Sequence, residues 1–350
     1  MSTKKHPSAN TSRLQQILEN IWYQGGKGKW ILLPLTFVYC ALHAFQRWKL
    51  TRKRSKMPLP VIIVGNISVG GTGKTPAVIY LVNLLLNAGY QPAIITRGYG
   101  GKSVQWPKGV NAKSDTVEVG DEPVLMAKRA QVPVVAGPDR CLDIQLLRSK
   151  YNCDVVISDD GLQHYKLHRD IEIVLVDGER QLGNGCCLPA GPLRENARRL
   201  KSVDFVLLNS SHHQHKQAFM LQHQIKSVFL MGLEGKTIYS LSDNKSQDIQ
   251  SLKGALVHAV TGIGNPQRFY QTLENEGVRL IKHSFPDHHV FSQEELNFND
   301  KKIIIMTEKD AVKCQNFSLD NVWYLPVKAQ IEEAFDKQVL DKLSHIIDNR

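Results

Sequence analysis

The chain has 350 residues, of which 42% are hydrophobic, so it is long enough to build a large buried core in one or two domains. Its six cysteines form no CxxC pair, and a chain of this size needs no disulfide scaffold, which excludes a small cystine-rich fold and indicates a reducing compartment. The net charge of +11 is uneven, because residues 1–56 contain eleven Lys or Arg and a single acid, Glu19, and the rest is close to neutral.

An apolar segment lies inside this basic region. The sequence from Trp30 to Trp48 is WILLPLTFVYCALHAFQRW, and its uncharged part, up to Gln46, has 17 residues, the shortest length that can span a bilayer. Pro34 and His43 argue against spanning. Aromatic ends with flanking Lys and Arg are typical of a helix in an anionic membrane surface. We therefore expect a membrane-docking helix here, with a buried core helix as the alternative, and the sequence leaves open whether the segment spans the membrane or lies on it.

Beyond Pro60, short apolar runs alternate with helical stretches. Apolar runs of this length are typical of parallel strands buried on both faces, and the alternation predicts an α/β fold with a doubly wound, mostly parallel sheet. Strands are expected at 61–66, 92–96, 132–137, 154–158, 171–177 and 203–209, and helices at 75–87, 122–130 and 140–150.

The chain turns polar and patchy between residues 211 and 250, where we expect a domain joint. A second alternating set follows and predicts a smaller α/β domain, with strands at 254–260, 278–285, 302–307 and 322–327 and helices after Pro266 and up to Ile347. The expected division is a docking segment over 1–56, an α/β core over 57–225 and the smaller domain over 226–350.

The sharpest motif is GNISVGGTGKTP, residues 65–76, which follows the apolar run VIIV. A P-loop needs a strand, a Gly-rich turn whose N–H groups face phosphates, and then Lys and Ser/Thr at a helix N-terminus. Lys74 is expected to reach the β- and γ-phosphates, and Thr75 to ligate Mg²⁺. Ser68 stands where the strict pattern has glycine, and a plain Gly-rich turn is the alternative. The expected nucleotide-binding residues are Ser68, Val69, Gly70, Gly71, Thr72, Gly73, Lys74 and Thr75.

Two carboxylates follow another apolar strand, in DVVISDDG. P-loop enzymes place an acid at the end of a neighbouring strand to hold Mg²⁺, so Asp159 and Asp160 predict a magnesium site. Guanine-specific proteins carry [NT]KxD, whereas here Lys309 and Asp310 are adjacent in IIIMTEKD, so ATP is the expected nucleotide.

Further polar residues follow strands or open helices. TRGYGG places Arg97 and Tyr99 near the expected active edge. Asp121, in VGDEP, is either a helix N-cap or a general base for an acceptor hydroxyl. Arg140 follows a strand, where a phosphate contact and a solvated helix start are the alternatives. In FPDHH, Asp287 beside His288 could orient a base.

Seven motifs occur in order along the chain: SVGGTGKTP, TRGYG, GDEP, DDGLQH, PAGPLRE, TGIGNP and FPDHH. Over about residues 20–330 they resemble the tetraacyldisaccharide 4'-kinase family of lipid A biosynthesis, which shares Ser at the position of Ser68. The resemblance implies transfer of the γ-phosphate of ATP, with Mg²⁺, to the 4'-hydroxyl of a tetraacylated glucosamine disaccharide 1-phosphate, which yields lipid IVA.

The resemblance also implies roles for individual residues. The base aspartate of the family corresponds to Asp121, and its histidine partner to His288, although the adjacent His289 keeps that choice open. Magnesium chelation falls on Asp159 and Asp160. The positions that the family uses near nucleotide or acceptor correspond to Arg97, Tyr99, Arg140, Gln163 and Glu195.

A lipid acceptor gives the N-terminal segment a purpose, because the enzyme must dock where the acceptor resides. We expect a peripheral or single-anchor protein on the cytoplasmic face of the inner membrane of a Gram-negative-type cell. Nucleic acid is not an expected partner, since the basic run at 52–56 lacks interleaved aromatics. The alternative function is a membrane-associated P-loop ATPase switch, but such proteins commonly carry an extra lysine early in the P-loop, and residues 65–72 contain none.

Overall fold

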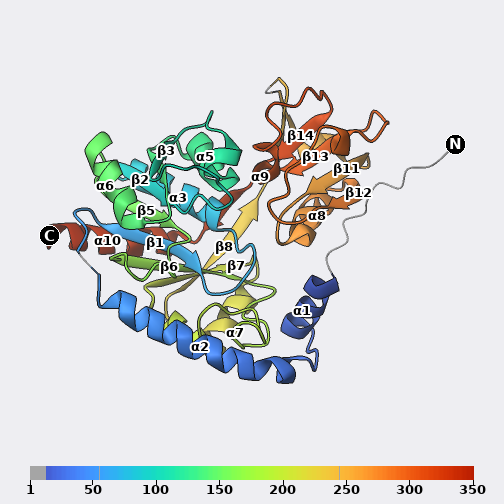
Figure 1. Ribbon diagram of the computed structural model, residues 1–350. Coiled ribbons are helices and arrows are strands. Elements are labelled where there is room, and N and C mark those ends of the chain that lie inside the picture. The colour runs from blue at the N-terminus through green and yellow to red at the C-terminus, as the bar shows by residue number, and fades with distance from the viewer. Residues whose placement is uncertain (1–12, 55, 244) are drawn as a thin grey trace.

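The computed structural model describes residues 13–54, 56–243 and 245–350. A larger α/β unit carries a smaller one at one end, and a long N-terminal helix runs along the larger unit on the side away from the smaller one (Figure 1). The first twelve residues of the expected docking segment, including Lys4 and Lys5, lie outside the described residues.

The larger sheet has nine strands within the described ranges, in the order β15-β8-β7-β6-β1-β5-β2-β4-β3. All neighbouring strands from β8 to β4 run parallel, and β15 and β3 pair antiparallel at the two edges. This confirms the doubly wound, mostly parallel sheet. The strands are β1 (Val61–Asn66), β2 (Pro92–Thr96), β3 (Lys108–Val110), β4 (Val134–Ala136), β5 (Val155–Asp159), β6 (Ile171–Asp177), β7 (Phe205–Asn209), β8 (Val228–Glu234) and β15 (Lys328–Ile331).

Helices cover both faces of this sheet, because successive strand residues point to opposite sides. In β1, Ile62 and Val64 enter one core while Val61 and Ile63 enter the other. Helices of the first face are α3 (Lys74–Asn87), α5 (Asp121–Ala130), which short α4 (Thr116–Val119) precedes, and α10 (Glu333–Asp348). Those of the second face are α6 (Arg140–Lys150) and α7 (His213–His223).

The smaller sheet has the strand order β10-β9-β14-β13-β11-β12 within the described residues. Helix α8 packs Phe269, Tyr270 and Leu273 on one face. The elements are β9 (Thr237–Ser240), β10 (Ser246–Asp248), β11 (Leu256–Thr261), α8 (Pro266–Asn275), β12 (Arg279–Ser284), β13 (Ile304–Thr307), α9 (Glu308–Ala311) and β14 (Val322–Leu325).

The division between the sheets differs from the division expected at residue 225. Strands β8 and β15 and helix α10 belong to the larger unit, so the smaller sheet occupies only 237–325. The chain crosses between the units at 235–236 and at 326–327, and these crossings touch, since a Cβ on Gly235 would lie 3.1 Å from Leu325 and from the carbonyl of Pro326. The sequence of α10 alone shows its apolar stripe, but which of the two sheets the stripe covers depends on the tertiary structure.

Helix α10 is expected to contribute strongly to the stability of the larger unit. Phe335 is fully buried against Phe205 and Phe229, with ring centroids 5.6 and 5.5 Å away. Phe335→Ala should therefore lower the free energy of unfolding by about 3–5 kcal/mol, while the partly exposed Ile347→Ala on the same helix should change it by less than about 1 kcal/mol. Chemical denaturation of both variants measures this, and equal small effects would mean that α10 is not part of this core.

Polar side chains attach helix α2 (Lys29–Thr51) to the larger unit, and α1 (Arg13–Tyr23) precedes it. The Thr36 hydroxyl donates to the carbonyl of Cys187 (3.3 Å), the Tyr39 hydroxyl donates to the carbonyl of Arg194 (2.9 Å), and His43 bonds Tyr165. The opposite side, which we call the α2 apolar face, exposes Trp30, Ile31, Leu35, Phe37, Val38, Leu42, Phe45 and Trp48. A surface helix in water normally shows the reverse arrangement.

The helix expected over the apolar segment is confirmed. Within the described ranges, none of the helices has both the length and the apolarity needed to cross a membrane.

Candidate active site

The P-loop connects β1 to the N-terminus of α3. Gly70 and Gly73 have φ of +115° and +92°, which side chains rarely adopt, so the motif needs glycine at both positions. The amide of Asn66 donates to the carbonyls of Ser68 (2.7 Å) and Gly70 (3.3 Å), and Asn209 donates to that of Thr72 (2.9 Å). These bonds from strand ends hold the loop with its N–H groups available at a helix N-terminus, the arrangement that binds phosphate.

Of the expected nucleotide-binding residues, Val69 to Thr75 line one large cavity. Ser68 does not line it, because it is buried and forms a β-bridge with Leu193. The backbone N–H of Val69 donates to the carbonyl of Pro192 at 2.8 Å. Ser68 therefore joins the P-loop to the 188–195 loop, and its position does not need the flexibility of glycine.

Asp159 and Asp160 lie beside the P-loop because β5 pairs in parallel with β1, with Asp159 opposite Val64. Lys74 Nζ is 3.6 Å from Asp160, and the Arg194 guanidinium is 3.4 Å from the same carboxylate. Burial would raise the pKa of Asp160, but the charges of Lys74 and Arg194 outweigh it and lower that pKa. Burial, together with the charges of Glu122 and Asp160, raises the pKa of Asp159 to about 7.

The residues around Asp159 fit a magnesium ion. Asp159 is 1% exposed, its Oδ2 accepts a hydrogen bond from Thr96, and its buried Oδ1 has no protein partner. A buried carboxylate oxygen without a partner is costly unless a cation or water satisfies it. No cluster of three or more His, Cys, Asp or Glu side chains that could hold a metal occurs in the described part of the chain. Mg²⁺ would therefore complete its shell with phosphate oxygens and water, as is usual for this ion.

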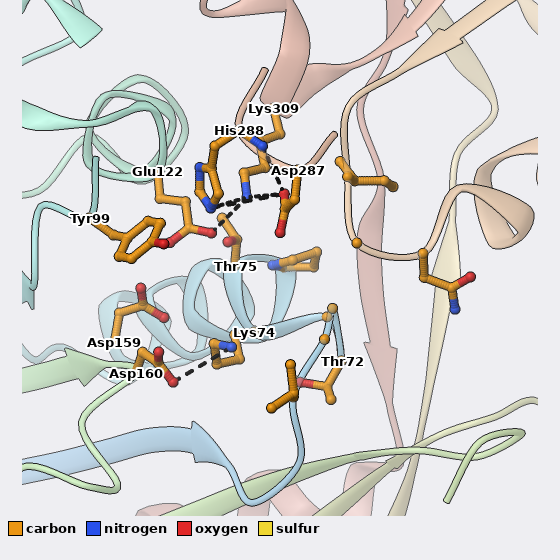
Figure 2. Close-up of a pocket in the computed structure, with 18 of the residues that line it drawn as sticks. Thr72, Lys74, Thr75, Tyr99, Glu122, Asp159, Asp160, Asp287, His288 and Lys309 are labelled. Carbon is orange, nitrogen blue, oxygen red and sulfur yellow. Dashed lines mark hydrogen bonds and ion pairs between the residues drawn. The ribbon is translucent and has the colours of Figure 1, made fainter. Parts of the chain in front are cut away.

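A second polar group lies across the cavity from Lys74 (Figure 2). His288 Nδ1 is 3.0 Å from Asp121 Oδ2 and 3.2 Å from Oδ1, which joins α5 to the loop after β12. Lys309 Nζ is 3.1 Å from Glu122 Oε1, 3.4 Å from Asp287 Oδ1 and 3.3 Å from His288 Nε2. This group draws its members from both units.

The charges in this group set its protonation. Burial would raise the pKa of Asp121, but the hydrogen bond from His288 and the charge of Lys309 outweigh it, so the pKa falls below its usual value. The bond to Asp121 raises the pKa of His288, against burial and Lys309, which lower it. Burial would lower the pKa of Lys309, but Glu122, Asp121 and Asp287 raise it well above its usual range. Asp121 is therefore ionised and Lys309 is protonated at neutral pH.

The structure pairs Asp121 with His288 and directs His289 elsewhere. His289 Nε2 lies 3.1 Å from Glu295 Oε2, and its ring packs on Phe285 and Phe291.

Of the remaining predicted site residues, some line the cavity and others hold the lining residues in place. Arg97 and Tyr99 line the cavity, and the Tyr99 ring lies 4.9 Å from that of His288. Arg140 reaches the wall, but it is buried and donates to the carbonyls of Gly137 (2.7 Å) and Asp159 (3.1 Å). Arg140 therefore positions Asp159.

Gln163 and Glu195 form a supported pair next to the P-loop. The Gln163 amide donates to the carbonyl of Asn66 (3.1 Å) and to Glu195 Oε1 (2.9 Å). Gln163 lines the cavity, whereas Glu195 is buried behind the lining and lies 3.5 Å from Arg199. Glu195 thus orients Gln163.

The cavity has a volume of about 1210 Å³ and extends from the P-loop to the N-terminal helices. Leu18, Trp22 and Tyr23 of α1 and Tyr39 and His43 of α2 lie in its wall. Asp121, which is 6% exposed, lies behind His288 and outside the lining.

Sequence reasoning gave no site role to several residues that hold this region together. Asn66, Asp177 and Asn209 end β1, β6 and β7, where polar residues at the carboxyl ends of parallel strands gather at one edge. That rule could have identified them. Arg268 of the smaller unit reaches Asp177 (3.5 Å) and the carbonyl of Asn209 (3.2 Å), and Lys309 reaches Glu122, contacts that follow no local pattern.

Comparisons with known proteins identify the family of the chain. A family model described as tetraacyldisaccharide-1-P 4'-kinase matches residues 28–344. The tetraacyldisaccharide 4'-kinase of Shewanella denitrificans is 45% identical over 341 residues, which cover 95% of this chain and 99% of that protein. The corresponding protein of Haemophilus influenzae is 45% identical over 332 residues, which cover 93% and 96%.

Among solved structures, the crystal structure of LpxK from Aquifex aeolicus in complex with ATP is similar to this chain, with 32% identity and a TM-score of 0.73. The similarity covers 90% of this chain and 99% of that one. Since the family model and these relatives extend over nearly the whole sequence, the chain belongs to the tetraacyldisaccharide-1-P 4'-kinase family.

Proposed function

We propose that this chain transfers the γ-phosphate of ATP to the 4'-hydroxyl of a tetraacyldisaccharide 1-phosphate, the reaction for which its relatives are named. The observation that carries the proposal is one cavity with a P-loop on one wall and His288, hydrogen-bonded to buried Asp121, on the other. Phosphoryl transfer depends mainly on positioning and on charge neutralisation, and both walls supply these.

The P-loop side binds the phosphates. Backbone N–H groups from Gly70 to Thr75 face the phosphate chain, and Lys74 moves from Asp160 to the β- and γ-phosphates. Thr75, Asp159 and Asp160 would hold Mg²⁺, which neutralises the charge that develops on the phosphates during transfer. Arg97 and Arg194 add positive charge to the same cavity wall.

The opposite side receives the acceptor. Asp121 takes the proton of the 4'-hydroxyl, and its hydrogen bond from His288 keeps the carboxylate ionised and oriented. Because Asp121 lies behind His288 and the pair bridges the two units, we propose that the acceptor reaches Asp121 when the units shift relative to one another. Tyr99 and Gln163 line the space between the two walls.

The acyl chains leave the cavity toward the membrane, in our proposal. Helix α2 lines the cavity with Tyr39 and His43 and carries the α2 apolar face on its opposite side, so the sugar could lie inside the cavity while the chains pass around the helix into lipid. Lys29 stacks on Trp30 and Arg52 on Trp48, with the cations 5.2 and 3.9 Å from the ring centroids, which places basic groups beside aromatics at both helix ends. This pattern fits an anionic membrane surface, on the cytoplasmic side where ATP is available.

Substitutions in the α2 apolar face are expected to release the protein from membranes. Phe37→Ser combined with Phe45→Ser should lower partitioning to anionic phospholipid vesicles by about 10-fold or more per side chain, because burying each ring contributes about 1.5–3 kcal/mol. Sedimentation with vesicles measures the bound fraction. Leu221→Ser, an exposed apolar residue on α7, is the matched control. Unchanged sedimentation of the double variant would contradict docking through this face.

A transfer assay tests the function itself. The purified protein is incubated with γ-labelled ATP, Mg²⁺ and detergent-dispersed tetraacyldisaccharide 1-phosphate, and the label is followed into lipid and free phosphate. We expect label on the lipid. Release of free phosphate alone, at a rate that the lipid does not change, would instead favour the membrane-associated ATPase switch.

A further inference from the structure

We propose that Lys309 is a positioning residue for the transfer reaction: its ammonium donates a hydrogen bond to Nε2 of His288 and so holds the imidazole in the tautomer whose Nδ1–H donates to Asp121. The inference rests on the proposed kinase function for its kinetic consequence, but the tautomer is a property of the protein alone.

The contacts of Lys309 account for all of its donors. An ammonium group has three N–H donors and no acceptor. Lys309 Nζ has three partners within hydrogen-bond distance, Glu122 at 3.1 Å, His288 Nε2 at 3.3 Å and Asp287 at 3.4 Å (Figure 2). A donor at Nε2 leaves that nitrogen only the role of acceptor. The proton of the neutral imidazole must then lie on Nδ1, which faces Asp121 Oδ2 at 3.0 Å.

This arrangement assigns the two members of the pair different tasks. Both ring nitrogens of His288 are engaged, so the ring has no free lone pair with which to take a proton from a hydroxyl. The Asp121 carboxylate accepts from His288 and from the backbone N–H of Glu122 (2.9 Å), which leaves further lone-pair positions on its oxygens. Lys309 thus favours Asp121, and disfavours His288, as the proton acceptor.

The charge of Lys309 also opposes protonation of His288. The groups that face His288 are Asp121 from α5, Asp287 from its own loop, Lys309 from α9 and the ring of Tyr99; Glu122 pairs with Lys309, and the charge of Lys313 lowers the pKa of Asp121. Without Lys309, two carboxylates would remain beside the imidazole and favour its cationic form. An imidazolium hydrogen-bonded to Asp121 makes that carboxylate a weaker base. As the pH is lowered, activity would therefore fall at a higher pH than it does in the parent protein.

Two side-chain contacts hold Lys309 in place. Thr307 caps α9 by accepting from the backbone N–H of Asp310. Arg129 of α5 pairs with Glu308 of α9 at 2.6 Å, which fixes α9 against the helix that carries Asp121 and Glu122.

The kinetic test compares Lys309→Met with Lys309→Arg, and uses the exposed Lys301→Met as a control that removes the same charge from the same unit. We expect Lys309→Met to lower kcat about 10-fold to 100-fold, with the KM for ATP nearly unchanged, and to move the acidic limb of the kcat–pH profile to higher pH. Lys309→Arg keeps a charged donor, so its kcat and the position of its acidic limb should lie between those of Lys309→Met and the parent. Lys301→Met should match the parent in both. An acidic limb that stays in place in Lys309→Met would overturn the proposal.

The tautomer of His288 can be determined spectroscopically, without an activity assay. Long-range proton–nitrogen correlation spectra of the parent protein, labelled in histidine and assigned with His288→Gln, distinguish Nδ1–H from Nε2–H at a pH above the imidazole pKa. We expect Nδ1–H, and the Nε2–H form would overturn the proposal even if Lys309→Met did not fold. A parent protein that shows Nδ1–H but transfers no phosphate to lipid would instead refute the proposed function.

Discussion

Asp121→Asn is expected to lower kcat for phosphate transfer to the lipid by about 10²–10⁴-fold, the range for loss of a general base, while ATP binding changes little. Asparagine has nearly the same shape and still accepts the hydrogen bond from His288 Nδ1, which lies 3.0 Å away in the parent, but it cannot take a proton. Asp121 lies behind the wall opposite the P-loop and outside the cavity lining, so its substitution leaves the phosphate-binding side intact. Initial-rate kinetics with varied acceptor, together with equilibrium binding of ATP, measure both quantities.

Glu118→Gln is the matched control for this substitution. It removes one carboxylate three residues upstream, from a side chain that pairs with Lys108 at the surface. Its kcat should equal that of the parent. If Asp121→Asn abolished ATP binding as well, Asp121 would be a ligand of the nucleotide and its assignment as the base would be incorrect.

Lys74→Ala is expected to have the other large effect, a loss of at least about 10²–10³-fold in kcat, because a charged donor directed at the transferred phosphate acts mainly in the transition state. Lys74 begins α3 and is held 3.4 Å from Asn66 Oδ1 and 3.6 Å from Asp160, so the protein places its ammonium beside the carboxylate pair before the nucleotide arrives. The label-transfer assay measures the effect directly.

Lys166→Ala serves as the control for Lys74→Ala, since Lys166 is a partly exposed lysine that pairs with Asp139 outside the cavity. Circular dichroism should show both variants folded. Transfer to lipid at the parental rate by Lys74→Ala would contradict the phosphate-binding role of the P-loop in this chain.

The sequence predicted the larger sheet well because its strands are short apolar runs buried on both faces. β1 and β6 occupy the expected 61–66 and 171–177, and β2 the expected 92–96. It did not predict β8 and β15, since β8 is only half buried along its length and β15 has four residues in a polar context. Their place in the larger sheet depends on pairing across about a hundred residues, for which the local sequence carries no signal.

The sequence also predicted the part of the site that lies at the ends of neighbouring strands, but not its long-range contacts. Lys74, Asp159 and Asp160 follow neighbouring strands, and the rule that carboxyl ends of parallel strands share an edge brings them together. The pairing of Asp121 with His288, which are 167 positions apart, was predicted only from the resemblance to the 4'-kinase family, a resemblance that is confirmed. Lys309 had no predicted role, because its contact with Glu122 exists only when α9 packs on α5.

The two touching crossings between the units show that the smaller unit is an insertion in the larger one. Strands β8 and β15 are antiparallel neighbours, with Glu234 opposite Lys328, which is the spacing of a hairpin. A two-residue type I′ turn such as Asn-Gly could therefore replace residues 235–327 and leave the strand order of the larger sheet unchanged. Such a shortened chain would keep Lys74 and Asp159 but lose His288 and Lys309, so the topology separates the proposed phosphate-binding residues from the histidine and lysine proposed to support the base.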